Sequence, residues 1–347
     1  MATLEKQKTL HPYYSFDRVF SYNAFWMYVV GARGLGKTYG AKLKAIQRAL
    51  DKGEQFVYLR RYKDEIKAVR TKFFSDLITT NEFPEWDFKI EGDEIKASPK
   101  SLADEKKRPW KVLGYLAQLS TAAFQKSVSY DAVTLIIFDE FIIEKGMIHY
   151  LPNEATAFAQ FYSTVDRWKD KTRVLFLANS VSIMNPYFMA QKIDPSEGEW
   201  VKRANGYVVA HFARSSDFAA SVSKTKFGQF IEGSEYEEFA VGNRFHDMNT
   251  SLIERKSKDA RYMFTFHTRE GVFSIWSVMA SGVYYAQQAR PKSEINYALE
   301  AGLMREGMEL LTYSDVQLQV FRAAFKQGRV RFDVPQTRNA IMEIYKR

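Results

Sequence analysis

The residues with the clearest chemical potential stand near the N-terminus, in the stretch GARGLGKT (31–38). Its glycines and its final Lys-Thr pair fit the pattern G-x-x-x-x-G-K-[ST], in which a glycine-rich turn points backbone N–H groups at phosphate. In that pattern the lysine reaches the β- and γ-phosphates, and the hydroxyl group of the last residue binds Mg²⁺. The predicted nucleotide-binding residues of this loop are Gly31, Ala32, Arg33, Gly34, Leu35, Gly36, Lys37 and Thr38.

The segments on either side of this loop are the ones that a phosphate-binding loop requires. An apolar, β-prone run from Trp26 to Val30 precedes it. After Thr38, apolar residues recur at helical spacing as far as Leu50, and Gly53 then supplies a C-terminal stop. A glycine-rich turn that binds nothing is the alternative. The order strand, loop, helix favours nucleotide binding instead.

A second acidic feature can complete such a site. Asp139 and Glu140 directly follow four apolar residues, 135–138, that are typical of a buried parallel strand. Asp139 would bind Mg²⁺ through water, and Glu140 would orient and activate the attacking water. Kinases and switch GTPases often lack this adjacent glutamate, whereas ATP-driven machines commonly have it. The alternative is a strand that ends in a solvated acidic pair.

The remaining pattern predicts a mostly parallel sheet with helices, which is an α/β fold. We expect strands at 54–61, 110–118, 172–180 and 206–212, and a hairpin at 86–97. Asn179 stands at the end of one of these strands, where ligands of such sheets bind, so it is placed to sense the γ-phosphate. An ordinary turn or cap residue is the alternative for Asn179.

Four cations follow an expected helix that includes residues 155–162: Arg167, Lys169, Lys171 and Arg173. Phosphoryl transfer is accelerated when a cation reaches the transition-state phosphate, often from a neighbouring subunit. Arginine is best suited because it is always charged and can bind two oxygens at once. Spacing alone, however, favours a solvated helix end with basic residues that suit the helix dipole.

Composition narrows the class of protein. The 347 residues are enough for two domains, and 46% of them are hydrophobic, which argues against disorder. The absence of cysteine excludes disulfides and zinc–thiolate sites. No apolar run reaches the ~18 residues of a membrane span, and the N-terminus lacks the apolar core of a signal peptide. The net charge of +9 permits a polyanionic partner.

The C-terminal part predicts a different kind of domain. Between 250 and 287, four β-prone runs are separated by hairpin-like turns, and a helix follows with Ser314 as its N-cap. A meander followed by helices suits an RNase H-like αβ domain. A two-metal nuclease needs clustered carboxylates, and these strands offer mainly Glu254 and Glu270. Nuclease activity is therefore not expected.

The same part of the chain is basic. Residues 241–347 carry 16 Lys and Arg against 11 Asp and Glu, which is +5 of the total +9. Arg329 and Arg331, on one face of an expected short strand, are candidate nucleic-acid contacts. A solvated basic face is an equal alternative.

Seven stretches, taken together, match the motifs of a known family in order: VVGARGLGKTYG, EQFVYLRRYK, TLIIFDEFIIEK, YLPNEA, TRVLFLANSVSIMNPYF, KTKFGQFIEGSEY and IERKSKDARYMF. With them the chain resembles the DNA-packaging motor ATPases of the phi-twenty-nine type of small tailed bacteriophage. The resemblance extends to about residue 270 and is looser beyond it. It implies a terminase-like P-loop ATPase of the ASCE type (additional strand, conserved glutamate), joined to a degenerate RNase H-like nuclease domain.

The resemblance also implies partners. Such proteins form a homo-oligomeric ring, a pentamer, which docks on the prohead at the portal vertex and drives double-stranded DNA inward. A structural packaging RNA takes part in the best-known members.

Single residues can be matched to the family's motifs. The resemblance gives Lys37 the Walker A role, and Asp139 with Glu140 the Walker B role. It places Arg167 at the trans-acting arginine finger, which raises this role above that of a solvated helix end. Asn179 matches the asparagine that ends the corresponding strand.

Other matches leave a role open. Lys63 and Lys126 fall on basic family positions that suit DNA or trans contacts. Lys169 and Lys171 also fall on basic positions, but the lysine side chains leave their role open. Arg33, inside the loop, can contact phosphate or a neighbouring subunit.

The sequence thus predicts an ATPase domain at 1–214, a linker or hinge at 215–240, and a nucleic-acid-facing domain with a vestigial nuclease fold at 241–347. We expect an ATP-driven double-stranded DNA translocase that packages a viral genome into a preformed prohead, with ATP and Mg²⁺ as cofactors. It would act in the host cell cytoplasm, without contact with a membrane, and would be absent from the mature particle. The alternatives are a helicase or secretion-type motor, or a nucleic-acid-binding adaptor that uses ATP only to assemble.

Overall fold

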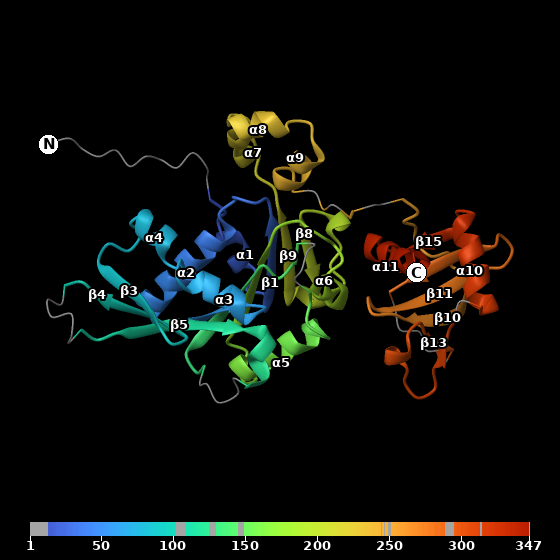
Figure 1. Cartoon of the computed structure of the whole chain (residues 1–347), viewed down its shortest axis with the longest axis horizontal. Helices are drawn as coiled ribbons and strands as arrows, with labels where there is room; N and C mark the ends of the chain where they lie inside the picture. Colours follow the sequence, from blue (N-terminus) through green and yellow to red (C-terminus); the bar gives the residue numbers. More distant parts are fainter. Residues whose placement is uncertain are drawn as a thin grey trace. The chain divides into compact units, whose positions relative to one another are not determined.

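The computed structural model of the chain describes residues 13–101, 108–124, 130–144, 149–243, 245, 247–248, 251–288, 295–312 and 314–346. The chain folds into two compact units (Figure 1). The N-terminal unit consists of residues 1–181 and 195–246, and the C-terminal unit consists of residues 182–194 and 247–347.

These units differ from the expected boundaries in two respects. Residues 182–194 lie inside the expected ATPase domain, 1–214, but they pack with the C-terminal unit. Met189, from this segment, is buried in the C-terminal core, which explains the assignment. The expected linker, 215–240, forms three short helices that belong to the N-terminal unit: α7 (Ser216–Ser223), α8 (Lys226–Ile231) and α9 (Glu235–Ala240).

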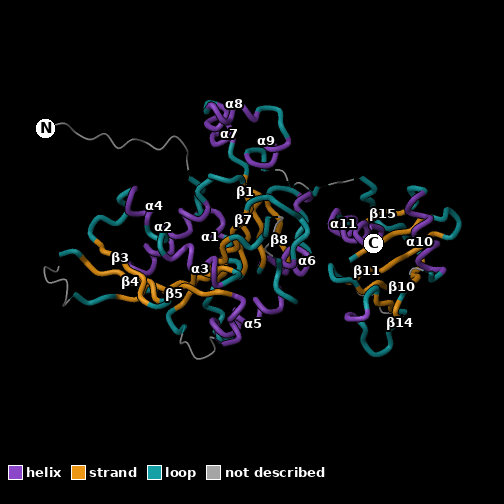
Figure 2. The backbone as a smooth tube through the Cα atoms, viewed as in Figure 1, coloured by secondary structure: helices purple, strands orange, loops and turns teal. Residues whose placement is uncertain are grey.

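The N-terminal unit is built on a nine-stranded sheet with the order β3-β4-β5-β2-β6-β7-β1-β9-β8 (Figure 2). The strands from β5 to β9 in this order are parallel, and β3, β4 and β8 are antiparallel to their neighbours. The strands are β1 (Trp26–Gly31), β2 (Gln55–Arg60), β3 (Trp86–Glu91), β4 (Glu94–Pro99), β5 (Lys111–Gln118), β6 (Val133–Asp139), β7 (Arg173–Ala178), β8 (Trp200–Arg203) and β9 (Val208–Ala213). The predicted strands and hairpin of this region are confirmed. The edge strand β8 was not expected.

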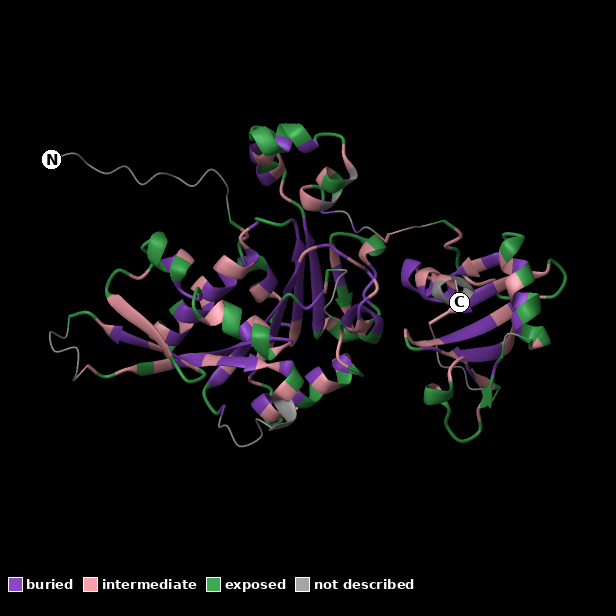
Figure 3. Ribbon diagram, viewed as in Figure 1, coloured by how far each residue is buried: buried purple, intermediate pink, exposed green. Residues whose placement is uncertain are grey.

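Helices cover both faces of this sheet. They are α1 (Asp17–Ser21), α2 (Lys37–Lys52), α3 (Lys63–Arg70), α4 (Ser75–Thr79) and α5 (Glu154–Asp166). Apolar residues of α2 pack with Val29 and Ile137 on one face. On the other face, Phe158 of α5 stacks on Phe138 and contacts Phe176. The strands between these layers are almost wholly buried (Figure 3).

Glycines fix both ends of α2. Gly36 stands at its N-terminus with φ of 77°, and Gly53 stands at its C-terminus with φ of 72° and donates its N–H to the carbonyl of Ala49. Both angles lie in the left-handed region, which disfavours residues with a Cβ. The predicted helix and its glycine stop are therefore confirmed.

The C-terminal unit contains a six-stranded sheet with the order β14-β13-β10-β11-β12-β15. Strands β10, β11 and β12 form the predicted antiparallel meander, and β13, β14 and β15 each join by parallel pairing. The elements are β10 (Arg261–His267), β11 (Val272–Val278), β12 (Val283–Gln287), β13 (Asn296–Ala298), β14 (Glu309–Leu310), β15 (Val330–Phe332), α6 (Pro186–Gln191), α10 (Val316–Lys326) and α11 (Pro335–Lys346). The likeness to an RNase H-like domain stays a prediction.

Two local predictions in this unit were wrong. Asp315, and not Ser314, is the N-cap of α10, and its side chain makes no capping hydrogen bond. The first of the four β-prone runs is not a strand, because only Ile253 forms a single bridge there, to Phe332. A strand needs a ladder of such pairs. No helix in the described parts of the chain has the length and apolar character of a membrane span.

Candidate functional site

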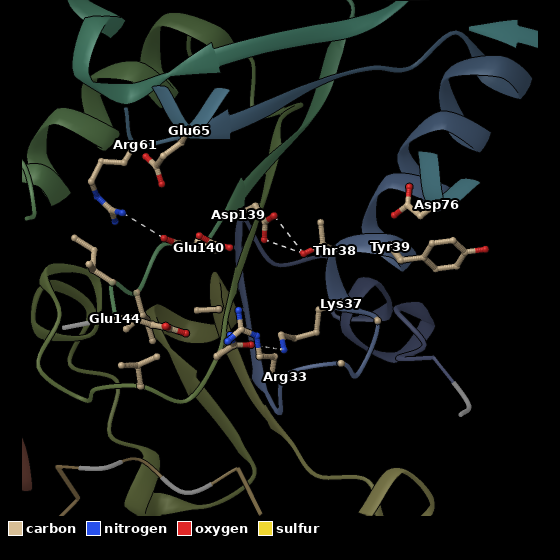
Figure 4. A pocket seen from close by; sticks show the side chains of 17 residues that line it. Arg33, Lys37, Thr38, Tyr39, Arg61, Glu65, Asp76, Asp139, Glu140 and Glu144 are labelled. Carbon is tan, nitrogen blue, oxygen red and sulfur yellow. Dashed lines mark hydrogen bonds between the residues drawn. The ribbon is translucent and has the colours of Figure 1, made fainter. Parts of the chain in front are cut away.

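A cavity of about 530 Å³ lies at the carboxyl edge of the parallel strands in the N-terminal unit (Figure 4). The loop between β1 and α2, the end of β6 and the end of β7 all line it. The register explains this convergence, because Asp139 pairs with Leu177 and Val30 pairs with Ala178. The ends of these three strands therefore lie side by side, as ligand sites of such sheets require.

Lys37 extends into the loop that precedes it. Its Nζ donates to the carbonyl oxygens of Gly31 at 2.8 Å and Ala32 at 2.7 Å. The residue is only 7% exposed, and this burial lowers the pKa of Lys37 to about 8, although nearby Asp139 raises it. The loop thus holds a charged amine ready for phosphate. Arg33, in the same loop, is exposed and lines the cavity.

Thr38 and Asp139 meet across the cavity. The Thr38 hydroxyl donates to the Asp139 carboxylate, with oxygen–oxygen distances of 3.1 and 3.2 Å. The hydroxyl of Tyr58 donates to the same carboxylate at 2.5 Å and fixes its position from β2. Mg²⁺ binds oxygen ligands, usually one or two carboxylates together with phosphate and water. A hydroxyl and a carboxylate in contact fit that requirement.

Asn179 is the third element of the cavity. It directly follows β7, and its Oδ1 accepts a hydrogen bond from Lys37 Nζ at 3.1 Å. One amide therefore contacts the residue that is predicted to bind the terminal phosphates. Any movement of Lys37 toward a ligand would change this contact.

Glu140 lies at the cavity, and Arg60 holds its carboxylate. Arg60 Nη2 is 2.5 Å from Glu140 Oε2, and Arg60 Nη1 is 3.3 Å from Asp139 Oδ2. The backbone of Glu140 has φ of 57°, which is uncommon for a residue with a side chain. Burial is the largest single effect and disfavours the guanidinium charge, but Asp139, Tyr58, Glu140 and Glu65 together outweigh it and raise the pKa of Arg60 above its usual value. One arginine therefore bridges the carboxylate that is predicted to bind the metal and the one that is predicted to be catalytic.

Sequence reasoning missed the role of Arg60. The only signal was its place at the end of the expected strand 54–61. The pairing of Leu59 with Phe138 brings that strand end next to Glu140, and no periodicity in the sequence shows which strands are neighbours.

A second missed feature is a buried ion pair between Arg61 and Glu154. Their side chains are 1% and 0% exposed, and two nitrogen–oxygen contacts of 2.7 and 2.8 Å join them. Arg61 also donates to the carbonyl oxygens of Glu140 and Phe141. Such a two-point contact fixes geometry well. It anchors the first residue of α5 beside the catalytic strand end.

Arg167 is far from this cavity. It follows the other end of α5, and its Nη1 is 3.4 Å from Oδ1 of Asp131, which precedes β6. Because β6 has seven residues and a strand rises ~3.3 Å per residue, its ends, Val133 and Asp139, are roughly 20 Å apart, and Asp131 lies two residues before its amino end. Arg167 therefore does not reach the cavity of its own chain.

The predicted nucleic-acid residues fall in both units of the chain. Lys63 is exposed as the first residue of α3, and Lys126 lies outside the described residues. Arg331, in β15, forms an ion pair with Glu254 at 2.9 Å. Arg329 precedes that strand and is exposed. Lys63 belongs to the N-terminal unit, and Arg329 and Arg331 belong to the C-terminal unit, so their role as nucleic-acid contacts stays a prediction.

Comparisons with known proteins agree with this architecture. The family described as Podovirus DNA encapsidation protein (Gp16) matches residues 7–347. The DNA packaging protein of Bacillus phage phi29 is 33% identical over 340 residues, which are 96% of this chain and 97% of that protein.

Two solved structures are also similar. One chain of the bacteriophage Phi-29 viral genome packaging motor assembly has a TM-score of 0.69 and 31% identity, covering 96% of this chain and 98% of that chain. The N-terminal domain of the DNA packaging ATPase from bacteriophage phi29 has a TM-score of 0.52 and 32% identity, covering 59% of this chain and 98% of that chain.

Proposed function

Because the chain belongs to the Podovirus DNA encapsidation protein family, we propose that it is an ATP-driven motor that moves double-stranded DNA into a preformed prohead. The observation that carries the proposal is the convergence of Lys37, Thr38 and Asp139 at one cavity. Phosphate recognition and metal binding thus meet at the carboxyl edge of one parallel sheet. ATP and Mg²⁺ are the ligands that this chemistry suits.

The groups that line the cavity have different roles in this proposal. The backbone N–H groups of the loop and the Lys37 amine bind the phosphates of ATP. Thr38 and Asp139 would hold Mg²⁺, which supplies charge neutralisation at the β- and γ-phosphates when bound. Asn179 contacts Lys37 at 3.1 Å and is suited to report the loss of the γ-phosphate.

Glu140 is the group that orients and activates the attacking water. Its carboxylate is held by Arg60, with 2.5 Å between nitrogen and oxygen. A carboxylate oxygen that a guanidinium already contacts is less available to accept a hydrogen bond from water. Release of Glu140 from Arg60 would therefore accompany activation. The same arginine contacts Asp139, which couples metal binding to that release.

Arg167 completes the site from another copy of the chain. Its contact with Asp131, beyond the amino end of β6, supports action in the site of another chain, because Asp139 lies at the other end of that strand. A homo-oligomeric ring supplies a neighbour at every site, and the family resemblance suggests a pentamer at the portal vertex. A structural RNA at that vertex belongs to the same proposal. The protein would act in the infected cell during assembly and be absent from the mature particle.

The C-terminal unit would face nucleic acid without cutting it. Among its described residues no group of three or more histidine or acidic side chains could hold a metal ion. We expect purified protein with Mg²⁺ or Mn²⁺ to leave plasmid DNA uncut, and to bind DNA with an affinity that falls as salt rises. Metal-dependent nicking that persists in a Lys37→Ala preparation would overturn this part of the proposal.

The test of the main proposal is the ATPase rate of the full chain, alone and with double-stranded DNA and empty proheads. A motor should turn over ATP faster when both are present, and should protect DNA from added nuclease as packaging proceeds. A rate that neither partner changes would favour an adaptor that uses ATP only to assemble. Strand displacement on a forked duplex would instead favour a helicase.

A further inference from the structure

Trp168 is the most exposed of the large apolar side chains in the described structure, at 88% of its full accessible area. It lies between Arg167 and Lys169, in the turn that follows α5. A fully exposed indole has no stabilising role in the fold of its own chain. Tryptophan is also among the residues that most often dominate the binding energy of protein interfaces.

The backbone of this turn has a fixed and unfavourable shape. Arg167, Trp168 and Asp170 have φ of 53°, 58° and 54°, in the left-handed region that side chains other than glycine disfavour. The buried carboxylate of Asp166 holds the turn by accepting three backbone hydrogen bonds of 2.8–3.0 Å from residues 170–172. Strain of this kind persists where the surrounding structure enforces it, often at functional positions. Here it presents the indole to solvent.

Asp131 holds the cations on both sides of the indole. Its Oδ1 is 3.4 Å from Arg167 Nη1 and 3.6 Å from Lys169 Nζ. All three side chains are about half exposed, with 45% for Arg167, 55% for Lys169 and 60% for Asp131. Ion pairs with this exposure are weak and can be exchanged for others.

We propose that residues 167–170 dock against a second copy of this chain, with Trp168 packed on the rim of that copy's nucleotide cavity. Before docking, the carboxylate of Asp131 pairs with Arg167 and Lys169. On docking, the acidic side chains of the second copy's cavity replace Asp131 as their partners. The inference rests on the proposed function, since it supplies the contact through which one copy completes the site of the next.

Two observations identify the second copy as the occupant. The first is that the proposed function requires Arg167 at a nucleotide cavity, whereas Arg167 does not line the cavity of its own chain and contacts Asp131 beyond the amino end of β6. The second is charge. The cavity lining carries more acidic than basic side chains, and the turn presents the basic Arg167 and Lys169. The acidic lining residues are Glu65, Asp76, Asp139, Glu140 and Glu144.

The same lining offers an apolar contact for the indole. Ile143, which is half-buried, follows β6 and lines the cavity. The contact joins the amino edge of one sheet to the carboxyl edge of the next, so it is head-to-tail. In a pair of chains, the cavity of one chain and the 167–170 turn of the other remain free to bind further copies. Repeated contacts of this type close into a ring or extend into a filament.

Cross-linking tests this geometry directly because the full chain contains no cysteine. Lys169→Cys and Ile143→Cys chains, which both keep Trp168, are mixed with Mg²⁺ and a non-hydrolysable ATP analogue, and then oxidised. We expect disulfide-linked pairs that contain one chain of each kind. A chain with both substitutions should form a ladder of linked species. Ile78→Cys, at an exposed position outside the cavity, replaces Ile143→Cys as the matched control. A yield no higher than in that control would overturn the proposal.

The contribution of the Trp168 side chain to docking is tested separately by sedimentation velocity. Trp168→Ala should raise the protein concentration at half-assembly roughly tenfold or more, because the loss of a well-packed indole costs that much at an interface. Trp168→Phe should recover part of the effect, and nucleotide binding should stay unchanged. Unaltered assembly of Trp168→Ala would overturn the role of the indole.

The two conclusions fail in different ways. If the wild-type protein packages DNA but the cysteine variants give no specific cross-link, the docking contact is contradicted and the proposed motor function is not. A specific cross-link in a protein that never hydrolyses ATP would support the contact and contradict the motor.

Discussion

The two ends of strand β6 carry opposite kinds of electrostatics. At the carboxyl end, Asp139 is 5% exposed and is contacted by Thr38, Tyr58 and Arg60. At the amino end, Asp131 is exposed and holds its cations at 3.4 and 3.6 Å. A buried network keeps one geometry, because breaking it leaves a charge without a partner. An exposed pair can change partners at little cost.

This difference suggests a division of labour within one sheet. The carboxyl end is preorganised for phosphate and metal, whereas the amino end presents groups that are suited to another copy. Substitutions at the two ends of β6 should therefore have different effects.

Substitutions at the carboxyl end should separate binding from hydrolysis. We expect Lys37→Ala to abolish nucleotide binding, because its amine contacts phosphate in the ground state. Glu140→Gln should keep binding and stop hydrolysis, since this carboxylate acts mainly on water. A fluorescent ATP analogue measures binding, and phosphate release measures turnover. Thermal unfolding serves as the control for Lys37→Ala, whose amine also binds two loop carbonyls. Normal turnover by Glu140→Gln would sink its assignment.

Removal of the Arg167 guanidinium, which lies near the amino end of β6, should also stop hydrolysis, but for a different reason. Arg167→Ala should bind ATP normally and lose ~10³–10⁵ in rate, the range for arginine fingers in other phosphoryl-transfer systems. Lys169 or Arg173 would reduce the loss if either substitutes in part.

A mixing experiment decides whether Arg167 acts in trans. Glu140→Gln chains have an intact arginine and a dead site, and Arg167→Ala chains have the reverse. Mixed rings should therefore recover activity that neither variant shows alone. If mixed rings form and no ratio restores turnover, Arg167 acts in its own subunit or is a solvated helix-end residue.

The affinity for ATP should depend on pH through Lys37. Burial lowers the pKa of Lys37 to about 8 in the free chain, and bound phosphates would raise it. Binding then takes up a proton above pH 8, and the dissociation constant should rise by up to about tenfold per pH unit between pH 8 and 10. Calorimetry in buffers of different ionisation enthalpy measures the proton uptake. Lys37→Arg is the control, because a guanidinium does not titrate in this range. A flat profile for the wild type would contradict the buried amine.

The same group has the opposite effect on the free chain. Between pH 8 and the ordinary lysine value of 10.5, the unfolded chain binds more protons at Lys37 than the folded chain does. The free energy of unfolding therefore gains a contribution that rises with pH in this window. The ligand-free chain should become more stable there while its affinity for ATP declines.

The smallest expected effect concerns Asp131. Because exposed pairs contribute about 0–1 kcal/mol, Asp131→Asn should lower the concentration at half-assembly by at most about fivefold. Sedimentation velocity measures the change. Asp17→Asn is the control, since Asp17 also forms an exposed pair, with Lys44 at 2.9 Å. A higher concentration at half-assembly for Asp131→Asn would show that Asp131 supports docking and does not oppose it.

Much of the N-terminal unit could be predicted from the sequence. Apolar runs such as 135–138 are long enough to be buried strands, and the glycines around 31–36 are required by a phosphate-binding turn. The helix after Thr38 follows from its apolar spacing and from Gly53. These are local properties, in which each residue's type limits its own backbone and burial.

The predictions were wrong where the local sequence allowed two structures. Ser314 and Asp315 are both good N-cap residues, and the choice between them depends on where the chain enters the helix. The segment 182–194 reads as part of the ATPase domain by its position, but its side chains pack with the C-terminal sheet. Position in the sequence does not determine which core a segment joins.

The sequence by itself determined which groups could do chemistry: a lysine and a threonine after glycines, an acidic pair after an apolar run, and an arginine after a helix. Only the tertiary structure decided which of these groups meet. The strand order brought Arg60 to Glu140 and joined Arg61 to Glu154, and it separated Arg167 from Asp139 by the length of a strand. The physical reason is that pairing between distant strands depends on the packing of the whole sheet, and no short stretch of residues encodes that pairing.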